Sequence, residues 1–466
     1  MEISVERYHY PIGQGTFSAQ IVRTSEKQYV CVYDCGSSAG GKNIEKYTRE
    51  LYEKTSGIID LLVISHLDDD HVNGVRSLYK EGFFIKKVIL PYMTIWERIL
   101  FFLDRCDDLP GGSNMSLGPR GLYAFILNKD NRGDGERYLE VSRDTEVVFS
   151  GTDISVESIS LRGGVIWAPR WEFVHFSLYS KEGDAFECSV INDFAAKVKE
   201  NYANWEELQS KETLSKEGLK KLREIYNEVY ELHRKNNGRR NYKVLGPNRS
   251  SIILYSGFER ESFRSYVDIF RQFPHPFKRV NYNWIATGML CTCHIGVSRP
   301  IVGLFHGHCC KNYSRCFNLK YHNICKKESY EDSVMNQSGK IPITGWLGTG
   351  DAELSNTDNC WELVHKLGMW RMRHVREITV PHHGGNKGSC PFLFHLLNGQ
   401  YEIICIIHSK ISGMRKRGSK VLYGKYGHPI REVCKNIWEA GNLKPVHVTE
   451  DVRTKYQSTT FIDISW

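Results

Sequence analysis

One short segment constrains this chain more than any other, because an apolar run ends abruptly in acids and histidines. Ile58–His66 reads IIDLLVISH, a length and composition typical of a strand covered on both faces. The next residues are Leu-Asp-Asp-Asp-His. Strands of this kind belong to sheets flanked by helices, so the segment predicts a layered α/β protein with polar chemistry at one sheet edge.

The flanking sequence supports this architecture. Gly13–Val22 and Tyr29–Ser38 are strand-like runs punctuated by glycine and predict a hairpin. Asn43–Thr55 carries apolar residues at helical spacing, and Thr94–Cys106 repeats the pattern. Trp167–Tyr179 is rich in aromatic residues and is expected to be a connector between elements.

The length of the chain bears on its organisation. At 466 residues it exceeds an ordinary single domain, which leaves two domains or one core fold with large insertions. The expected parts are an N-terminal half of the core fold over 1–192, a charged helical insertion over 193–245, a core strand over 246–258, a Cys/His-rich insertion over 259–340 and a C-terminal half over 341–466. The cysteine spacing in 259–340 fits no familiar zinc pattern, so buried free thiols are favoured there over a second metal site.

Composition excludes some classes of protein. A hydrophobic share of 41% is enough to bury a core and argues against a mainly disordered chain. The sequence contains neither a secretory signal nor a membrane-length apolar run, which predicts a soluble cytoplasmic protein without a membrane partner. The formal charge of +8 suits a phosphate-rich partner.

The acidic loop after the apolar run predicts a metal site. His66, Asp68, Asp70 and His71 lie close enough in sequence to converge on one small volume. Their nitrogen and oxygen donors suit zinc or manganese, and the lack of thiolates in the loop argues against a closed structural zinc site. Clustered carboxylates repel one another unless a cation neutralises them. The alternative is that the aspartates cap a following helix and the histidines are solvated.

These residues carry a resemblance to a known family. The pattern H-x-D-x-D-H resembles the metallo-β-lactamase superfamily signature H-x-H-x-D-H, with Asp68 at the second histidine. The variant is similar to that of the metallo-hydrolase domain in the DNA-uptake competence channel family. Three later segments match that subgroup in order: LGTGDAE at Leu347–Glu353, VPHHGG at Val380–Gly385 and YGHP at Tyr426–Pro429. The resemblance implies a four-layer αββα metallo-β-lactamase sandwich with a helical insertion and a Cys-rich insertion.

The resemblance also implies a ligand set and catalytic roles. Asp351 would bridge two cations, and one of the adjacent histidines His382 and His383 would be a ligand. We expect His383 to be that ligand and His382 to face the substrate, where it and Asp70 assist proton movement. The expected metal ligands are His66, Asp68, Asp70, His71, Asp351 and His383. The expected cofactor is one or two zinc ions, with manganese as the alternative.

Substrate-binding residues are expected outside this ligand set. In the resembling subgroup an asparagine and serine segment matches Gly246–Leu254, so Asn248 would replace a histidine ligand or orient water. A basic loop before YGHP would bind the phosphates that flank a scissile bond, and the alternative is an ordinary solvated loop. The residues expected to bind substrate are Asn248, Arg415, Lys416, Arg417, Lys425 and His428.

These expectations lead to an enzyme of one reaction class. The chain is expected to be a metal-dependent hydrolase that cleaves phosphodiester bonds through metal-activated water, acting on DNA first and RNA next. One alternative is a phosphodiesterase for small molecules or cyclic nucleotides, or another metallo-hydrolase. The other is a non-catalytic, metal-stabilised sensor or scaffold, with the charged helices of Asn201–Lys243 as a surface for a protein partner.

Overall fold

The computed structural model describes most of the chain outside the Cys/His-rich segment. The described residues are 2–38, 41–105, 115–128, 138–151, 153–161, 170–178, 185–237, 251–259, 344–385, 388–397, 402–409, 414–417, 420–423 and 427–463. They belong to one compact unit formed by Met1–Arg264 and Thr344–Trp466. The expected Cys/His-rich insertion, apart from Glu259, therefore lies outside the described residues.

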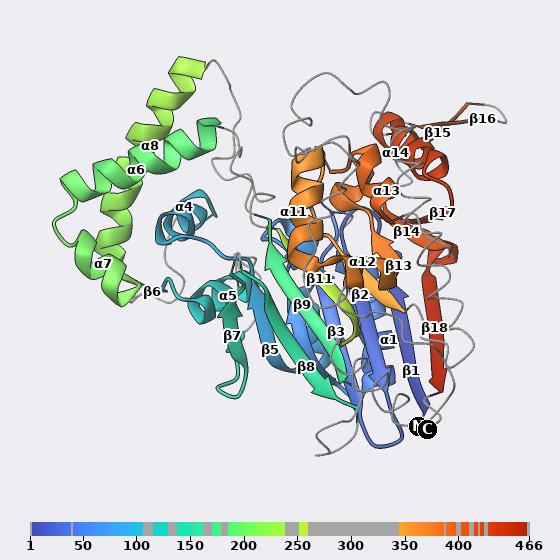
Figure 1. Ribbon diagram of the computed structural model, residues 1–466. Helices are drawn as coiled ribbons and strands as arrows, with labels where there is room; N and C mark the ends of the chain where they lie inside the picture. The colour runs from blue at the N-terminus through green and yellow to red at the C-terminus, as the bar shows by residue number, and fades with distance from the viewer. Residues whose placement is uncertain are drawn as a thin grey trace, which may run out of the picture. The chain divides into compact units, whose positions relative to one another are not determined.

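The first of two large sheets is built mainly from the N-terminal part of the chain (Figure 1). In spatial order its strands are β18 (Tyr456–Asp463), β1 (Glu2–His9), β2 (Phe17–Arg23), β3 (Gln28–Cys35), β4 (Ile58–Val63), β5 (Phe84–Leu90) and β7 (Glu146–Phe149). The strands from β18 to β3 pair antiparallel, and those from β3 to β7 pair parallel. The carboxyl ends of β3 and β4 therefore point to the same edge.

The second sheet has the same mixed character. In spatial order its strands are β17 (Leu443–Val448), β14 (Ile403–His408), β13 (Val375–Thr379), β12 (Gly345–Gly348), β11 (Ile252–Phe258), β9 (Arg170–Ser177) and β8 (Ser155–Ser160). The run from β12 through β13 and β14 to β17 is parallel. The loops that follow β12 and β13 consequently leave the sheet side by side.

Two apolar cores hold the layers together. Between the sheets, Tyr33 and Val63 of the first sheet pack with Trp171, Leu254 and Trp346 of the second. The opposite face of the first sheet packs against helices α1 (Gly41–Thr55), α3 (Val75–Glu81), α4 (Ile95–Arg105), α5 (Pro119–Asn128), α6 (Ala185–Asn201) and α8 (Lys216–Asn237). Both faces of the first sheet are covered, and its inner strand β4 is mainly apolar. The protein is an α/β sandwich of two mixed sheets.

Further helices follow the strands of the second sheet. Figure 1 shows them in orange and red: α11 (Thr357–Leu367), α12 (Met369–His374), α13 (Pro391–Leu397) and α14 (Gly427–Glu439). Of these, α12 contacts β11 and α14 contacts β17. Across the described part of the chain, no helix combines the length and apolar character needed to cross a bilayer.

Local sequence patterns predicted several elements correctly and one wrongly. The hairpin β2–β3 and the helix α1 are confirmed. The aromatic segment Trp167–Tyr179 was expected to be a connector, but Arg170–Ser177 forms the strand β9, paired between β8 and β11. Trp171–Ser177 is buried at every position, so the strand lacks the alternation that marks a half-exposed strand.

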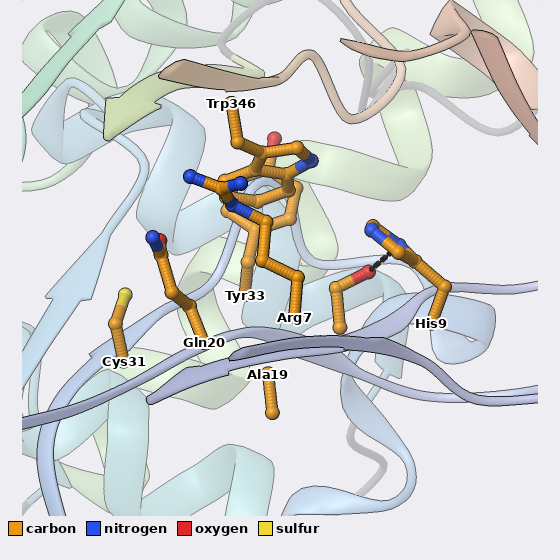
Figure 2. Close-up of a pocket in the computed structure, with 8 residues that line it drawn as sticks. Arg7, His9, Ala19, Gln20, Cys31, Tyr33 and Trp346 are labelled. Carbon is orange, nitrogen blue, oxygen red and sulfur yellow. Dashed lines mark hydrogen bonds between the residues drawn. The ribbon is translucent and has the colours of Figure 1, made fainter. Parts of the chain in front are cut away.

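A small cavity lies between the sheets. It measures about 10 Å³ and is lined by Arg7, His9, Ser18, Ala19, Gln20, Cys31, Tyr33 and Trp346 (Figure 2). The Nε of Arg7, both amide atoms of Gln20 and the Nε1 of Trp346 find no hydrogen-bond partner among the described residues. A space of this size holds at most one ordered water, which would bond to these polar atoms. The cavity therefore belongs to the core and is too small for a substrate.

A buried ion pair joins α12 to β9. Arg371 contacts both carboxylate oxygens of Glu172, at 2.7 Å from Nε and 3.0 Å from Nη2. Replacing Arg371 with leucine is expected to lower the free energy of unfolding by about 3 kcal/mol, because the buried Glu172 carboxylate loses its partner. Urea unfolding measures this loss. The Arg49→Leu control breaks a surface pair with Glu81 and should cost well under about 1 kcal/mol, whereas an equal loss in both variants would contradict the prediction.

Candidate metal centre

Three strand ends bring the site residues together. His66 and the short helix α2 (Asp69–Val72) follow β4, Asp351 follows β12, and His382 and His383 follow β13 within the 3-10 turn η3 (Pro381–Gly384). The first segment belongs to one sheet and the other two to the second sheet. The site is therefore assembled across the two sheets.

Glycine permits the close approach of these segments. Gly350 precedes Asp351 and has a positive φ of 51°, which favours glycine. A Cβ at this position would lie 2.6 Å from the Cβ of Ser65 and 2.6 Å from the Oγ of Ser251. The glycine in LGTGDAE thus lets the Asp351 turn pack directly against the loop that carries His66.

The donor atoms of one subset are spaced like the ligands of a tetrahedral ion. His71 Nε2 lies 3.3 Å from His383 Nε2 and 3.5 Å from Asp351 Oδ1. His383 Nε2 lies 3.4 Å from Asp70 Oδ2 and 3.7 Å from Asp351 Oδ1. Ligands that lie about 2.0–2.1 Å from a tetrahedral zinc ion are about 3.3–3.5 Å from one another. The donor atoms of His71, His383 and Asp351 are therefore spaced to share one divalent cation, and Asp70 lies beside His383.

Overlapping groups extend the cluster. Three triads have donor atoms within 4.8 Å of one another: His66, His71 and Asp351; Asp70, His71 and His383; and His66, Asp68 and Asp70. Within the described residues, His66 Nε2 and Asp351 Oδ1 are buried and have no hydrogen-bond partner. A buried polar atom without a partner costs free energy, and a cation would remove that cost at both atoms. The six predicted ligands are thus brought together in a form that could hold one or two ions.

The alternative to a metal site was that the aspartates of the acidic loop cap a helix and its histidines are solvated, and the structure does not agree with it. Asp68 is the N-cap residue of α2, but its side chain makes no capping hydrogen bond to the described helix. His66 and His71 are 1% and 0% exposed, so they are not solvated. The loop therefore points its histidines inward, as a metal site requires.

A carboxylate that the sequence did not predict as part of the site orients His71. Asp34, at the end of β3, accepts hydrogen bonds at Oδ1 from the Ser65 amide (2.6 Å) and at Oδ2 from the Ser65 hydroxyl (2.7 Å). The same Oδ2 lies 2.8 Å from His71 Nδ1, so that nitrogen donates and Nε2 is left to face the cluster. The signal in the sequence was an acidic residue at the end of an apolar strand, since Asp34 is the penultimate residue of β3 and His66 lies just beyond β4.

Burial and neighbouring charges shift the pKa values of the clustered side chains. Burial, together with the neighbouring His71, lowers the pKa of His66 to about 3 and keeps that imidazole neutral. Burial opposes ionisation of Asp351, but the histidines around it hold its pKa well below the usual range. Burial also opposes charge on His71, yet Asp34 and Asp351 raise its pKa to about 9. A bound cation would take the place of that proton.

The two adjacent histidines occupy different environments. Both have a left-handed backbone, with φ of 49° at His382 and 53° at His383, which is uncommon outside glycine and costs about 1–3 kcal/mol per residue. The side chain of His383 is 11% exposed and faces Asp70 and His71, whereas that of His382 is 38% exposed. His382 Nδ1 lies 2.7 Å from Asp351 Oδ2, and this hydrogen bond raises the pKa of His382.

The side chains of the expected substrate-binding residues lie outside what the structure describes. Asn248 and Lys425 lie outside the described residues. Arg415, Lys416 and Arg417 fall on β15 (Met414–Arg417), which pairs with β16 (Lys420–Tyr423), and His428 falls in the first turn of α14; only the backbone is described there. Helix α14 contacts the η3 turn that carries His382 and His383. Their role in substrate binding stays a prediction.

Replacing Asp34 with asparagine is expected to weaken metal binding about 10- to 100-fold. Both carboxylate oxygens of Asp34 accept hydrogen bonds from Ser65 and His71. An asparagine would put its NH₂ group, which is a donor, in place of one of these oxygens, so His71 would lose its fixed orientation. Titration with Zn²⁺ measures the affinity. Asp60→Asn is the matched control, because Asp60 also accepts a backbone hydrogen bond, from Val30 at 2.8 Å, but lies on β4 away from the cluster. Equal affinities in the two variants would contradict the positioning role.

The chain has little similarity to known proteins. No protein-family model and no curated protein matches the chain. A crystal structure of a long form RNase Z from yeast matches 37% of this chain and 27% of that chain, at 11% sequence identity and a TM-score of 0.16. The match spans a minor part of both chains.

Proposed function

We propose that this chain is a metal-dependent hydrolase with the four-layer αββα metallo-β-lactamase fold and that it cleaves phosphodiester bonds. The observation that carries the proposal is the convergence of six histidine and aspartate side chains from three separate segments. The order and spacing of the sequence motifs that resemble the superfamily support the fold assignment. Two mixed sheets with helices on their outer faces agree with it.

The proposed ligands are His66, Asp68, Asp70, His71, Asp351 and His383. A bound divalent cation supplies charge that activates water and neutralises charge developing on phosphoryl oxygens. Asp34 fixes the ring of His71, and the Ser65 hydroxyl lies 3.0 Å from His66 Nδ1, so both imidazoles are oriented before a substrate arrives. These contacts make the centre preorganised.

Proton movement is assigned to His382 and Asp70. His382 is the most exposed histidine of the centre, and its raised pKa increases the protonated fraction near neutral pH. In the proposed mechanism it would donate a proton to a leaving oxygen or a hydrogen bond to a phosphate. Burial opposes ionisation of Asp70, but His383 and His71 lower its pKa, so it remains an acceptor at neutral pH.

Nucleic acid is the proposed substrate, with DNA before RNA. The β15–β16 hairpin contains Arg415, Lys416, Arg417 and Lys420 in sequence, and it precedes α14, which contacts the η3 turn. Basic residues that flank a hydrolytic centre suit a polyanion. Binding through such residues should weaken steeply as salt concentration rises.

The test combines metal analysis with substrate assays. Chain purified without chelators is analysed for metal and assayed with Zn²⁺ or Mn²⁺ on labelled single- and double-stranded DNA, on RNA and on cyclic nucleotides. Asp70→Asn should lose cleavage, whereas Asp69→Asn changes the adjacent exposed acid and should retain it. Cleavage of cyclic nucleotides alone would favour a small-molecule phosphodiesterase. Absence of both metal and cleavage would favour a scaffold.

A further inference from the structure

Two cysteines outside the metal centre lie in contact. Cys360 is buried on α11, and Cys390 is partly exposed directly before α13. Their Sγ atoms are 3.7 Å apart. The Cys360 thiol also lies 3.6 Å from the carbonyl oxygen of Leu354. The two sulfurs would need to approach by less than 2 Å to reach the disulfide bond length of about 2.05 Å.

The thiol pair lies beside the backbone link between the two ligand-bearing segments of the second sheet. The Leu354 amide donates to the Gly388 carbonyl and the Cys390 amide donates to the Leu354 carbonyl, both at 2.9 Å. Leu354 follows Asp351 by three residues, and Gly388 follows His383 by five. A covalent bond between the two cysteines would therefore reinforce the contact between these segments.

The two thiols differ in reactivity. A hydrogen bond from Cys360 and backbone amides near the start of α13 lower the pKa of Cys390 to about 6, so at neutral pH it is largely the nucleophilic thiolate. The same hydrogen bond and burial raise the pKa of Cys360. Burial raises the pKa of Cys405 and of Cys434. Among the thiols that the structure describes, Cys390 combines partial exposure with a lowered pKa and a neighbouring thiol.

We propose that Cys390 and Cys360 form a redox-active pair that hydroperoxides convert to a reversible disulfide. The Cys390 thiolate attacks one oxygen of hydrogen peroxide, the O–O bond breaks, and Cys390 becomes a sulfenic acid while the second oxygen leaves as hydroxide and is protonated to water. Cys360 then attacks the Cys390 sulfur and the S–O bond breaks. The departing hydroxide takes the Cys360 proton as a second water. The two thiols lose two electrons in total, and the peroxide gains them.

The disulfide would join α11 to the segment before α13. Such a cross-link restricts the unfolded chain between residues 360 and 390 and raises the melting temperature of the oxidised protein. Reduction by a dithiol restores both thiols. This behaviour is independent of the hydrolytic activity, so failure of the proposed function leaves it intact.

The experiment uses the full chain with hydrogen peroxide as the oxidant. After treatment, remaining thiols are blocked with N-ethylmaleimide and peptides are mapped by mass spectrometry without reduction. The expected product is a Cys360–Cys390 cross-linked peptide that dithiothreitol removes, accompanied by a rise in melting temperature. In the Cys360→Ser variant the resolving thiol is missing, and dimedone should trap the Cys390 sulfenic acid. The Cys434→Ser control should form the cross-link as the unaltered chain does.

Two results would overturn the proposal. One is that Cys360 and Cys390 both remain free for alkylation while other cysteines oxidise. The other is that iodoacetamide alkylates Cys390 in the unaltered chain with a pH midpoint near the ordinary thiol value of about 8.5 instead of near 6. Both measurements use the unaltered chain, so they do not depend on the folding of a variant.

Discussion

Replacing Asp351 with asparagine is expected to remove bound metal and to reduce hydrolysis to background. Asp351 Oδ1 lies 3.5 Å from His71 Nε2, and its Oδ2 lies 3.7 Å from His66 Nε2, so this carboxylate faces both parts of the cluster. Asparagine keeps the shape of the side chain but removes the charge that attracts the cation. Because changes at residues that only orient ligands cost about 10- to 100-fold in affinity, loss of this ligand should lower the affinity for metal by at least about tenfold.

Metal analysis and thermal unfolding measure this effect. Chelation should lower the melting temperature of the unaltered chain, because bound metal stabilises only the folded state, and it should leave that of Asp351→Asn nearly unchanged. Asp358→Asn is the matched control, since Asp358 is exposed in the first turn of α11 on the same segment. Metal retained at an unchanged ratio in Asp351→Asn would show that Asp351 is not a ligand.

Replacing His382 and His383 one at a time is expected to separate proton transfer from metal binding. His383→Asn should lose metal, because Nε2 of His383 lies within 3.7 Å of donor atoms on Asp70, His71 and Asp351. His382→Asn should retain metal and lose about 10²- to 10⁴-fold in turnover, because the more exposed imidazole is assigned to proton transfer. Metal content and turnover measured on both variants test the assignment.

Asparagine is the appropriate replacement at both positions. Both residues have positive φ, and asparagine tolerates this conformation better than other residues with a Cβ. The two variants are thus matched in backbone strain, and each serves as the control for the other. Metal lost from His382→Asn but retained in His383→Asn would reverse the assignment.

The sequence predicted which side chains cluster better than it predicted the surroundings of each one. His66, Asp68, Asp70 and His71 are adjacent in one loop, so their convergence follows from local geometry. Asp351 and His383 could be proposed only through resemblance, because their approach to the loop depends on packing between two sheets. The orienting role of Asp34 was missed, since it requires a hydrogen bond between residues 34 and 71.

The sequence by itself determined the helix α1, whose apolar residues recur at helical spacing, and the strand β4, which is a continuous apolar run. Only the tertiary structure decided that Arg170–Ser177 is a strand, because burial on both faces removes the alternating pattern. It also decided that β1 pairs with β18 and that Cys360 contacts Cys390. Contacts of this kind depend on which surfaces meet after the chain has folded, and local residue spacing carries no information about that meeting.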